Sequence, residues 1–402
     1  MKNLFITSVS AIALSIGASA AFANDSNIDQ IGATNIATVD QTGGNEGAST
    51  IDQDGAQNLA EVTQSENPVG SVGASVAAND ATINQIGSNA RARIEQHSDN
   101  PGGASNMASI SQNSNGLAQG PDGVPSGYSM NGRIVQAGSG NSSSIVQSGN
   151  PNQAPGNGLG SGVTARNDQT GVDNQSEILQ DVFAQDANPF TDANVDQTGA
   201  GNVSGVRQRG SAALVNVSQT GAFNTSDVNQ GANREMTADV VQTGVDHNST
   251  INQTARTVTA SVNQDGTNQT SMITQGAQSR ESTATVVQST LDNTSTITQT
   301  NTSADAFVTQ SGTGGVSTIT QSDGANAYAL LTQSGMENVS TMSQTGDDHQ
   351  SIVLQSSDYN ESTVTQSGTA GANFANVSQT ITSGNISSVV QTGAGNTATV
   401  MQ

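Results

Sequence analysis

The sequence contains no cysteine and no tryptophan, and aromatic residues make up only 2% of its 402 positions. Without cysteine the chain can form neither disulfide bonds nor thiolate metal sites. Its 32% of hydrophobic residues is too little apolar bulk for several ordinary globular cores. Disorder is not favoured either, because acidic disordered chains are rich in charge and proline, whereas this chain is 11% charged and has seven prolines. The excess lies in Gly, Asn, Gln, Ser and Thr.

Positive charge is also scarce, since ten Lys and Arg residues stand against 33 acidic residues. The few Arg residues are scattered along the sequence, so we expect no binding to nucleic acid. Residues 1–23 are typical of an export signal: Lys2 precedes an apolar stretch at 4–17 that is too short to span a bilayer, and 21–23 fits an Ala-x-Ala cleavage site. The mature chain is therefore expected to begin at Asn24.

What the sequence does contain is a strict repeat. The pentapeptide STITQ at 295–299 returns unchanged at 317–321, and Gln310 lies midway between the two copies. Throughout the C-terminal half, glutamine recurs in steps of 11 to 13 residues, which indicates a repeat architecture. These glutamines are Gln197, Gln208, Gln219, Gln230, Gln242, Gln253, Gln264, Gln275, Gln288, Gln299, Gln310, Gln321, Gln333, Gln344, Gln355, Gln366, Gln379, Gln391 and Gln402.

Each half-repeat follows the pattern N-x-[AS]-x-[VI]-x-Q-x-G, as at 35–43, 360–368 and 385–393. Asn, Ala or Ser, Val or Ile, and Gln fall on alternate positions, which is the period of a strand with one face turned inward. The residues that follow are rich in Gly, Asn, Ser and Asp and suit a tight reversal. We therefore predict an all-β fold, a two-sheet β-solenoid of about 15 rungs with 22–23 residues per coil.

This architecture explains the recurring amide. A buried glutamine is costly without hydrogen-bond partners. In a stack with a spacing of ~4.8 Å, its N–H reaches the carbonyl of the identical side chain on the next rung. We predict that the glutamines above form a structural amide ladder inside the solenoid.

The motif also occurs before residue 190, but at irregular intervals, and all seven prolines lie in the gaps between its copies. Because proline cannot donate a ladder hydrogen bond, the gaps are expected to be loops. The mature chain thus divides into 24–190, solenoid rungs interrupted by Pro- and Gly-rich loops, and 191–402, uninterrupted repeats. The loops are expected at 65–78, 97–105, 113–130, 148–162 and 181–190.

Residues three and one before each glutamine should face outward, and alternate glutamines belong to opposite sheets. One outer face is rich in threonine, with Thr-x-Thr at 296–298, 318–320 and 363–365. The other carries an outer apolar strip, which is a candidate association surface. Its members are Val287, Phe307, Leu330, Ile352, Leu354 and Met401.

No carboxylate pair, histidine cluster or nucleophile recurs in a way that would build a catalytic site. We therefore expect no enzymatic activity, no metal site and no cofactor. His247 and His349 stand six before a glutamine, in the slot that asparagine holds elsewhere, and are interpreted as ladder variants. His97 is expected in a turn.

The doubled pattern behind an export signal resembles the curlin repeat of bacterial curli, the extracellular functional amyloid, over nearly all of 24–402. The resemblance implies secretion across the outer membrane of a Gram-negative bacterium and self-association into adhesive cell-surface fibres of the biofilm matrix. It also implies a nucleator subunit and an outer-membrane secretion channel as partners. The chain departs from the family in its greater length and in lacking the Gly-rich leader of the major subunit, since its first strand, 24–30, begins at the expected cleavage site.

The residues themselves favour a fibre subunit, because unpaired strand edges at the end rungs would act as templates for the next molecule. The alternative is a monomeric secreted solenoid that acts as a surface adhesin or an ice-binding protein through its Thr-rich face. Met272 and Asn252 interrupt that face.

Overall fold

The computed structural model describes residues 24–42, 47–66, 78–98, 104–113, 129–150, 162–183, 191–210, 212–231, 235–368 and 371–402. The expected export signal at 1–23 and all seven prolines lie outside these ranges, as do the central parts of the five expected loops.

The described residues form thirty strands in two sheets of fifteen, here named sheet A and sheet B. Successive strands alternate between the sheets, and each strand pairs in parallel with its counterparts one coil away. The predicted all-β, two-sheet solenoid of about 15 rungs is confirmed.

Sheet A consists of the odd-numbered strands β1 (Asp25–Ala33), β3 (Ala48–Ala56), β5 (Asp80–Ser88), β7 (Met107–Asn113), β9 (Ser142–Asn150), β11 (Gln175–Phe183), β13 (Val203–Arg209), β15 (Thr225–Gln230), β17 (Asn248–Gln253), β19 (Thr270–Gln275), β21 (Thr294–Gln299), β23 (Val316–Ser322), β25 (Val339–Gly346), β27 (Glu361–Gly368) and β29 (Ile386–Thr392).

Sheet B consists of the even-numbered strands β2 (Ile36–Asp40), β4 (Leu59–Glu66), β6 (Ala90–Ser98), β8 (Ser129–Ser139), β10 (Gly162–Val172), β12 (Thr191–Ala200), β14 (Ala213–Ala222), β16 (Met236–Val245), β18 (Val258–Thr267), β20 (Thr283–Leu291), β22 (Asp305–Gln310), β24 (Tyr328–Gln333), β26 (Gln350–Gln355), β28 (Phe374–Gln379) and β30 (Thr397–Met401).

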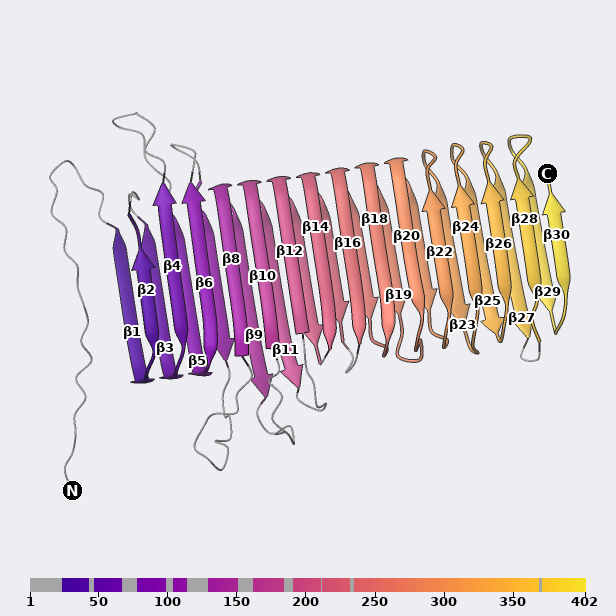
Figure 1. Ribbon diagram of the computed structural model, residues 1–402. Coiled ribbons are helices and arrows are strands. Elements are labelled where there is room, and N and C mark those ends of the chain that lie inside the picture. The colour runs from indigo at the N-terminus through magenta and orange to yellow at the C-terminus, as the bar shows by residue number, and fades with distance from the viewer. Residues whose placement is uncertain are drawn as a thin grey trace, which may run out of the picture.

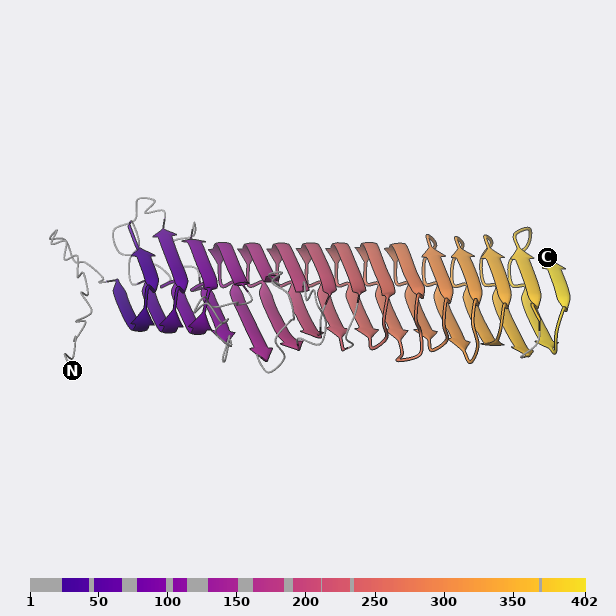
Figure 2. The same ribbon diagram turned by 60° about the horizontal axis from the view of Figure 1, so that its bottom comes forward.

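The solenoid is straight and elongated. In Figure 1 the strands stand side by side in chain order, so that the indigo β1 and the yellow β30 lie at opposite ends of the stack. The turned view in Figure 2 shows the two layers that the strands form along its whole length. The end strands are therefore far apart, and each leaves one edge outside the sheet.

The register of the parallel strands aligns identical or similar residues of successive coils. Gln253 of β17 stands opposite Gln275 of β19, and Ile251 stands opposite Ile273. Burial alternates along each strand, as the period of two predicts; in β23 the buried positions include Ile319. The main core is a continuous apolar cluster that runs from Ile51 to Val389, and two smaller clusters lie around Met130 and Met236.

The two sheets contribute different residues to this core. Sheet A places mainly Ser and Ile or Val inside, as with Ser271 and Ile273, whereas sheet B places mainly Ala and Val, as with Ala284 and Val286. Most strands thus add one small residue and one aliphatic residue between their amides. A core this thin needs no aromatic side chains, which accounts for the composition.

Several strands extend beyond the glutamine of the half-repeat. β8 and β10 each have eleven residues, because pairing with the neighbouring strand continues past the glutamine. The expected loops are correspondingly shorter, and the expectation that His97 lies in a turn is wrong. His97 belongs to β6, where it stands opposite Ser65 and Ala137.

A glycine two residues after the glutamine closes many of the strands. Gly199 and Gly221 have φ of +121°, a conformation that side chains disfavour. A Cβ on Gly199 would stand 1.8 Å from the carbonyl oxygen of Gly221 on the next rung. The stacking of rungs therefore requires glycine here for space as well as for conformation.

Candidate functional site: the amide ladders and the outer faces

The inward-facing glutamines form one unbroken row of hydrogen bonds in each sheet. Except in Gln391 and Gln402, the last of each row, every Nε2 donates to the Oε1 of the glutamine one coil further along, at 2.6 to 3.0 Å. The row in sheet A contains Gln30, Gln53, Gln85, Gln112, Gln147, Gln180, Gln208, Gln230, Gln253, Gln275, Gln299, Gln321, Gln344, Gln366 and Gln391. The row in sheet B contains Gln41, Gln64, Gln96, Gln136, Gln169, Gln197, Gln219, Gln242, Gln264, Gln288, Gln310, Gln333, Gln355, Gln379 and Gln402.

The second amide hydrogen ties the two sheets together. Nε2 of Gln253 in sheet A also donates to the carbonyl of Thr237, at the start of β16 in sheet B, at 2.9 Å. Gln264 in sheet B does the same to Asn248 at 3.3 Å. Each interior amide therefore uses both of its hydrogens and its oxygen, which removes the cost of burying it.

Both rows have the same direction, because every amide donates toward the C-terminal end of the stack. Oε1 of Gln30 and of Gln41 begin the rows and accept from no other glutamine of the described residues. At the other end, Nε2 of Gln391 and of Gln402 donate to backbone carbonyls and to no further described glutamine. The two ends of the stack thus carry complementary groups.

A row of asparagines at the strand entrances runs in the opposite direction. Asn224 donates from Nδ2 to Oδ1 of Asn202 at 3.0 Å, and Oδ1 of Asn224 accepts the backbone N–H of His247 at 3.2 Å. His247 continues the row: its Nδ1 lies 3.4 Å from the backbone nitrogen of Gln269, and its Nε2 lies 3.1 Å from the carbonyl oxygen of Thr243. The expectation that this histidine replaces asparagine in the ladder is confirmed.

These contacts assign one protonation state to His247. Nδ1 accepts a hydrogen bond and Nε2 donates one, so the ring is the neutral Nε2–H tautomer. Burial lowers the pKa of His247 below its ordinary value, although the Thr243 carbonyl and the carboxylates of Asp265 and Asp246 act in the opposite direction. His349 has the equivalent contacts in sheet B, to the backbone nitrogen of Asn373 at 3.4 Å and the carbonyl of Thr345 at 3.0 Å.

The outer face of sheet A carries a registered array of hydroxyl groups. Thr296, Thr318, Thr341 and Thr363 stand opposite one another on successive strands, and a second column runs beside them. The second column contains Thr274, Thr298, Thr320, Ser343 and Thr365. Met272 and Asn252 lie in these columns and interrupt the array, as expected from the sequence.

On the outer face of sheet B, the structure divides the six residues of the outer apolar strip. Phe307, Leu330 and Ile352 form one column on adjacent strands, and Leu354 lies beside Ile352. Val287 and Met401 stand apart from this column.

Sequence reasoning missed two aromatic residues of this surface. The ring of Tyr328 lies 5.9 Å from that of Phe307, centroid to centroid, and Phe374 follows two strands later. Both stand five before a glutamine, a position that also faces outward by the same period of two. Taking that position into account would have found them.

Three of the arginines, which are far apart in the sequence, lie together in the structure. Arg93, Arg133 and Arg166 lie opposite one another on β6, β8 and β10. With neighbouring acids they make a continuous network in which Arg133 lies 3.7 Å from Glu95 and 3.6 Å from Asp168. The members, in order of contact, are Glu61, Arg93, Glu95, Arg133, Asp168 and Arg166.

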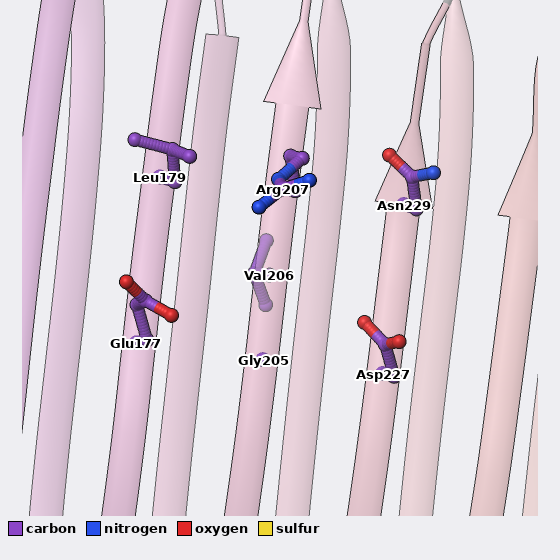
Figure 3. Close-up of a pocket in the computed structure, with 7 residues that line it drawn as sticks. All are labelled: Glu177, Leu179, Gly205, Val206, Arg207, Asp227 and Asn229. Carbon is purple, nitrogen blue, oxygen red and sulfur yellow. The ribbon is translucent and has the colours of Figure 1, made fainter.

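A shallow hollow on sheet A has a simple cause. Gly205 of β13 has no side chain, and Glu177 and Asp227 flank it from β11 and β15, with Arg207 beside it (Figure 3). The two carboxylates stand two strands apart, roughly 10 Å, which is too far for them to share a metal ion or a proton.

Within the part of the chain that the structure describes, no group of three or more His, Asp or Glu residues could hold a metal ion. In the same ranges, no helix is long and apolar enough to cross a membrane. Comparison with models of known protein families and with curated protein sequences finds no match.

Proposed function

We propose that the mature chain is the structural subunit of an extracellular, amyloid-like fibre of the curli type, which acts in surface adhesion and in the biofilm matrix. The observation that carries the proposal is the pair of like-directed amide rows. A second copy stacked end to end would pair the donors of Gln391 and Gln402 with the acceptors of its Gln30 and Gln41. Each addition would recreate the same end, so growth would continue without limit.

Exposed residues on the end strands support the same arrangement. Ile28 of β1 faces inward and is 42% exposed, whereas Ile51, its partner on β3, is completely buried. At the other end, the inward-facing Val400 of β30 is only partly buried, whereas its partner Val377 is completely buried. If the register continues across a junction, Asp25 and Asp29 would lie over the uncharged Ile386 and Val390. No like charges would oppose each other there.

The composition of the two sheets favours one alignment of the two copies at the junction, in which sheet A continues sheet A and sheet B continues sheet B. Ser26 and Ile28 of β1 would stack on the Ser and Val of β29, while Ala37 and Val39 of β2 would stack on the Ala and Val of β30. A shift by half a coil would place serine columns on alanine columns. Secretion to the cell surface, a nucleator subunit and an outer-membrane channel belong to the proposal through the resemblance to curlin repeats.

Seeded growth of the purified mature chain tests the proposal. We expect thioflavin-positive, detergent-resistant fibres with a cross-β reflection and a lag phase that preformed seeds abolish. Val400→Lys in β30 with Gln402→Lys directly after this strand places charge at two inward positions of the last coil and should slow elongation strongly. Thr399→Lys, which changes an outward position of the same strand, should elongate normally. A wild-type chain that stays monomeric for days at high micromolar concentration with seeds would refute the fibre.

The registered hydroxyl array of sheet A favours a second candidate, a monomeric secreted solenoid that acts as a surface adhesin or binds ice. Four successive strands carry two aligned hydroxyl residues each. Two results together would establish ice binding in place of the fibre. The wild-type chain would fail to form seeded fibres, and it would inhibit ice growth while the variant Thr318→Leu with Thr320→Leu would not.

A further inference from the structure

We propose that the C-terminal half of the outer face of sheet B is a lateral pairing surface for a second copy of this chain. The surface, here named the B-face patch, is centred on Leu330 and includes Phe307, Tyr328, Ile352 and Leu354. The inference concerns the side of the stack and not its ends, so it holds whether or not the chain forms fibres.

Charge distribution argues for a second copy as the occupant. The chain carries a net charge of −23, so two copies repel each other wherever their acids meet. On the seven strands of sheet B from β18 to β30, the positions five, three and one before each glutamine face outward. They include a single charged residue, Asp305, and Asp265 lies at the margin. The same positions from β4 to β12 hold the arginine and acid network. Two copies of an acidic chain meet face to face most readily where charge is absent, and the patch is such a region.

The size of the patch fits a reversible dimer. Seven strands at ~4.8 Å spacing and about five residues of each strand cover roughly 30 by 17 Å, so that face-to-face packing buries on the order of 1,000–1,200 Å² in total. This is the lower end of stable interfaces, and the depletion of charge with enrichment in aromatic residues is typical of an interface core.

The charges also determine the orientation. A two-fold axis along the solenoid would set Arg93, Arg133 and Arg166 opposite their own copies. A two-fold axis parallel to strand β24 keeps the arginines of the two copies apart. The two solenoids then run antiparallel, and the charged strands β4 to β12 of each copy extend beyond its partner into water. Leu330 meets Leu330 of the second copy in this arrangement, and Phe307 meets Ile352.

Because the chain has no cysteine, single introduced cysteines give an unambiguous test of the orientation. We expect Leu330→Cys to form a disulfide-linked dimer on mild oxidation. Phe307→Cys should cross-link with an Ile352→Cys chain more readily than with itself. Thr318→Cys, at the same position of the neighbouring β23 but on sheet A, should remain uncross-linked. Phe307→Cys that couples chiefly to itself would overturn the antiparallel arrangement.

Affinity is measured by sedimentation equilibrium on the chain with Val400→Lys and Gln402→Lys, which separates lateral pairing from end-to-end growth. Leu330→Lys should raise the dimer dissociation constant roughly 100-fold, whereas Thr318→Lys should leave it unchanged. Equal effects of the two lysines, or a monomer at all concentrations, would overturn the pairing surface. Neither result would affect the seeded-growth test of the fibre, which depends only on the ends.

Discussion

Nε2 of Gln219 donates a 2.8 Å hydrogen bond to Oε1 of Gln242, which is 23 residues later in the chain and one coil further along the stack. Both side chains are completely buried. The same contact recurs in every coil, so each amide depends on the amides before and after it. A fault at one rung therefore leaves unpaired groups on two others.

The first prediction concerns this dependence. Gln219→Leu leaves one N–H of Gln197 and the side-chain carbonyl of Gln242 without their partner. Because each unsatisfied buried group costs about 1–3 kcal/mol, we expect the free energy of unfolding to fall by about 2–4 kcal/mol. The double variant Gln219→Leu with Gln242→Leu also leaves only two ladder groups unpaired, an N–H of Gln197 and the side-chain carbonyl of Gln264. It should therefore cost much less than the sum of the two single variants in urea denaturation.

A distant pair serves as the control. Gln219→Leu with Gln310→Leu changes two glutamines of the same row that share no hydrogen bond, so the two losses should add. Full additivity in the adjacent pair as well would show that the amides act singly and not as a ladder.

The second prediction concerns pH. The pKa of His247 in the folded chain lies below its ordinary value of 6.5, so the unfolded chain takes up a proton there before the folded chain does. Above pH 6.5 His247 is neutral in both states and the folded chain keeps its full free energy of unfolding. As the pH falls below 6.5, protonation of the unfolded chain lowers this free energy. Protonation also places a hydrogen on Nδ1, facing the backbone N–H of Gln269.

His247→Asn restores the residue that the row carries elsewhere and cannot titrate. The free energy of unfolding of the wild type relative to this variant should therefore fall as the pH is lowered from 6.5 toward about 4.5, above the range in which most carboxylates titrate. The carboxylates of Asp246 and Asp265 are present in both proteins. A constant difference across this range would contradict the neutral, buried histidine.

The third prediction concerns the glycine that ends the strands. Gly221→Ala places a Cβ about 2.0 Å from the carbonyl oxygen of Gly244, at a φ that side chains disfavour, so adjacent rungs must separate. We expect a loss of at least about 1–3 kcal/mol and of amide protection in β14 and β16 by hydrogen exchange. Gly205→Ala is the matched control, since its Cβ would meet nothing closer than 3.6 Å, and it should be tolerated.

The fourth prediction concerns the serine column inside sheet A. Oγ of Ser271 is buried and has no hydrogen-bond partner among the described residues, whereas Oγ of Ser226 donates to Ser204 at 3.2 Å. Ser271→Ala should therefore raise the free energy of unfolding by about 1 kcal/mol, and Ser226→Ala should not. Thermal denaturation of the two variants compares them directly; stabilisation by both, or by neither, would contradict the assignment.

The step of 11 to 13 residues and the alternation within each half-repeat determined the strands, the two sheets and the inward position of the glutamines. These features follow from the sequence because a strand has a period of two and because an isolated buried amide is too costly to recur thirty times without a partner. The limits of the strands were less predictable. Pairing beyond the glutamine depends on what the neighbouring strand offers, and this placed His97 in β6 and not in a turn.

Only the tertiary structure decided which surface residues meet. Arg93 and Arg133 are forty residues apart in the chain, yet they stand opposite each other, because the connection between their strands varies in length while the register of the glutamines does not. The direction of the amide rows was equally invisible in the sequence, since a glutamine pattern reads the same whichever way each amide points. That direction arises from the second amide hydrogen, which the facing sheet holds at its backbone carbonyls and which leaves the other hydrogen aimed at the next rung.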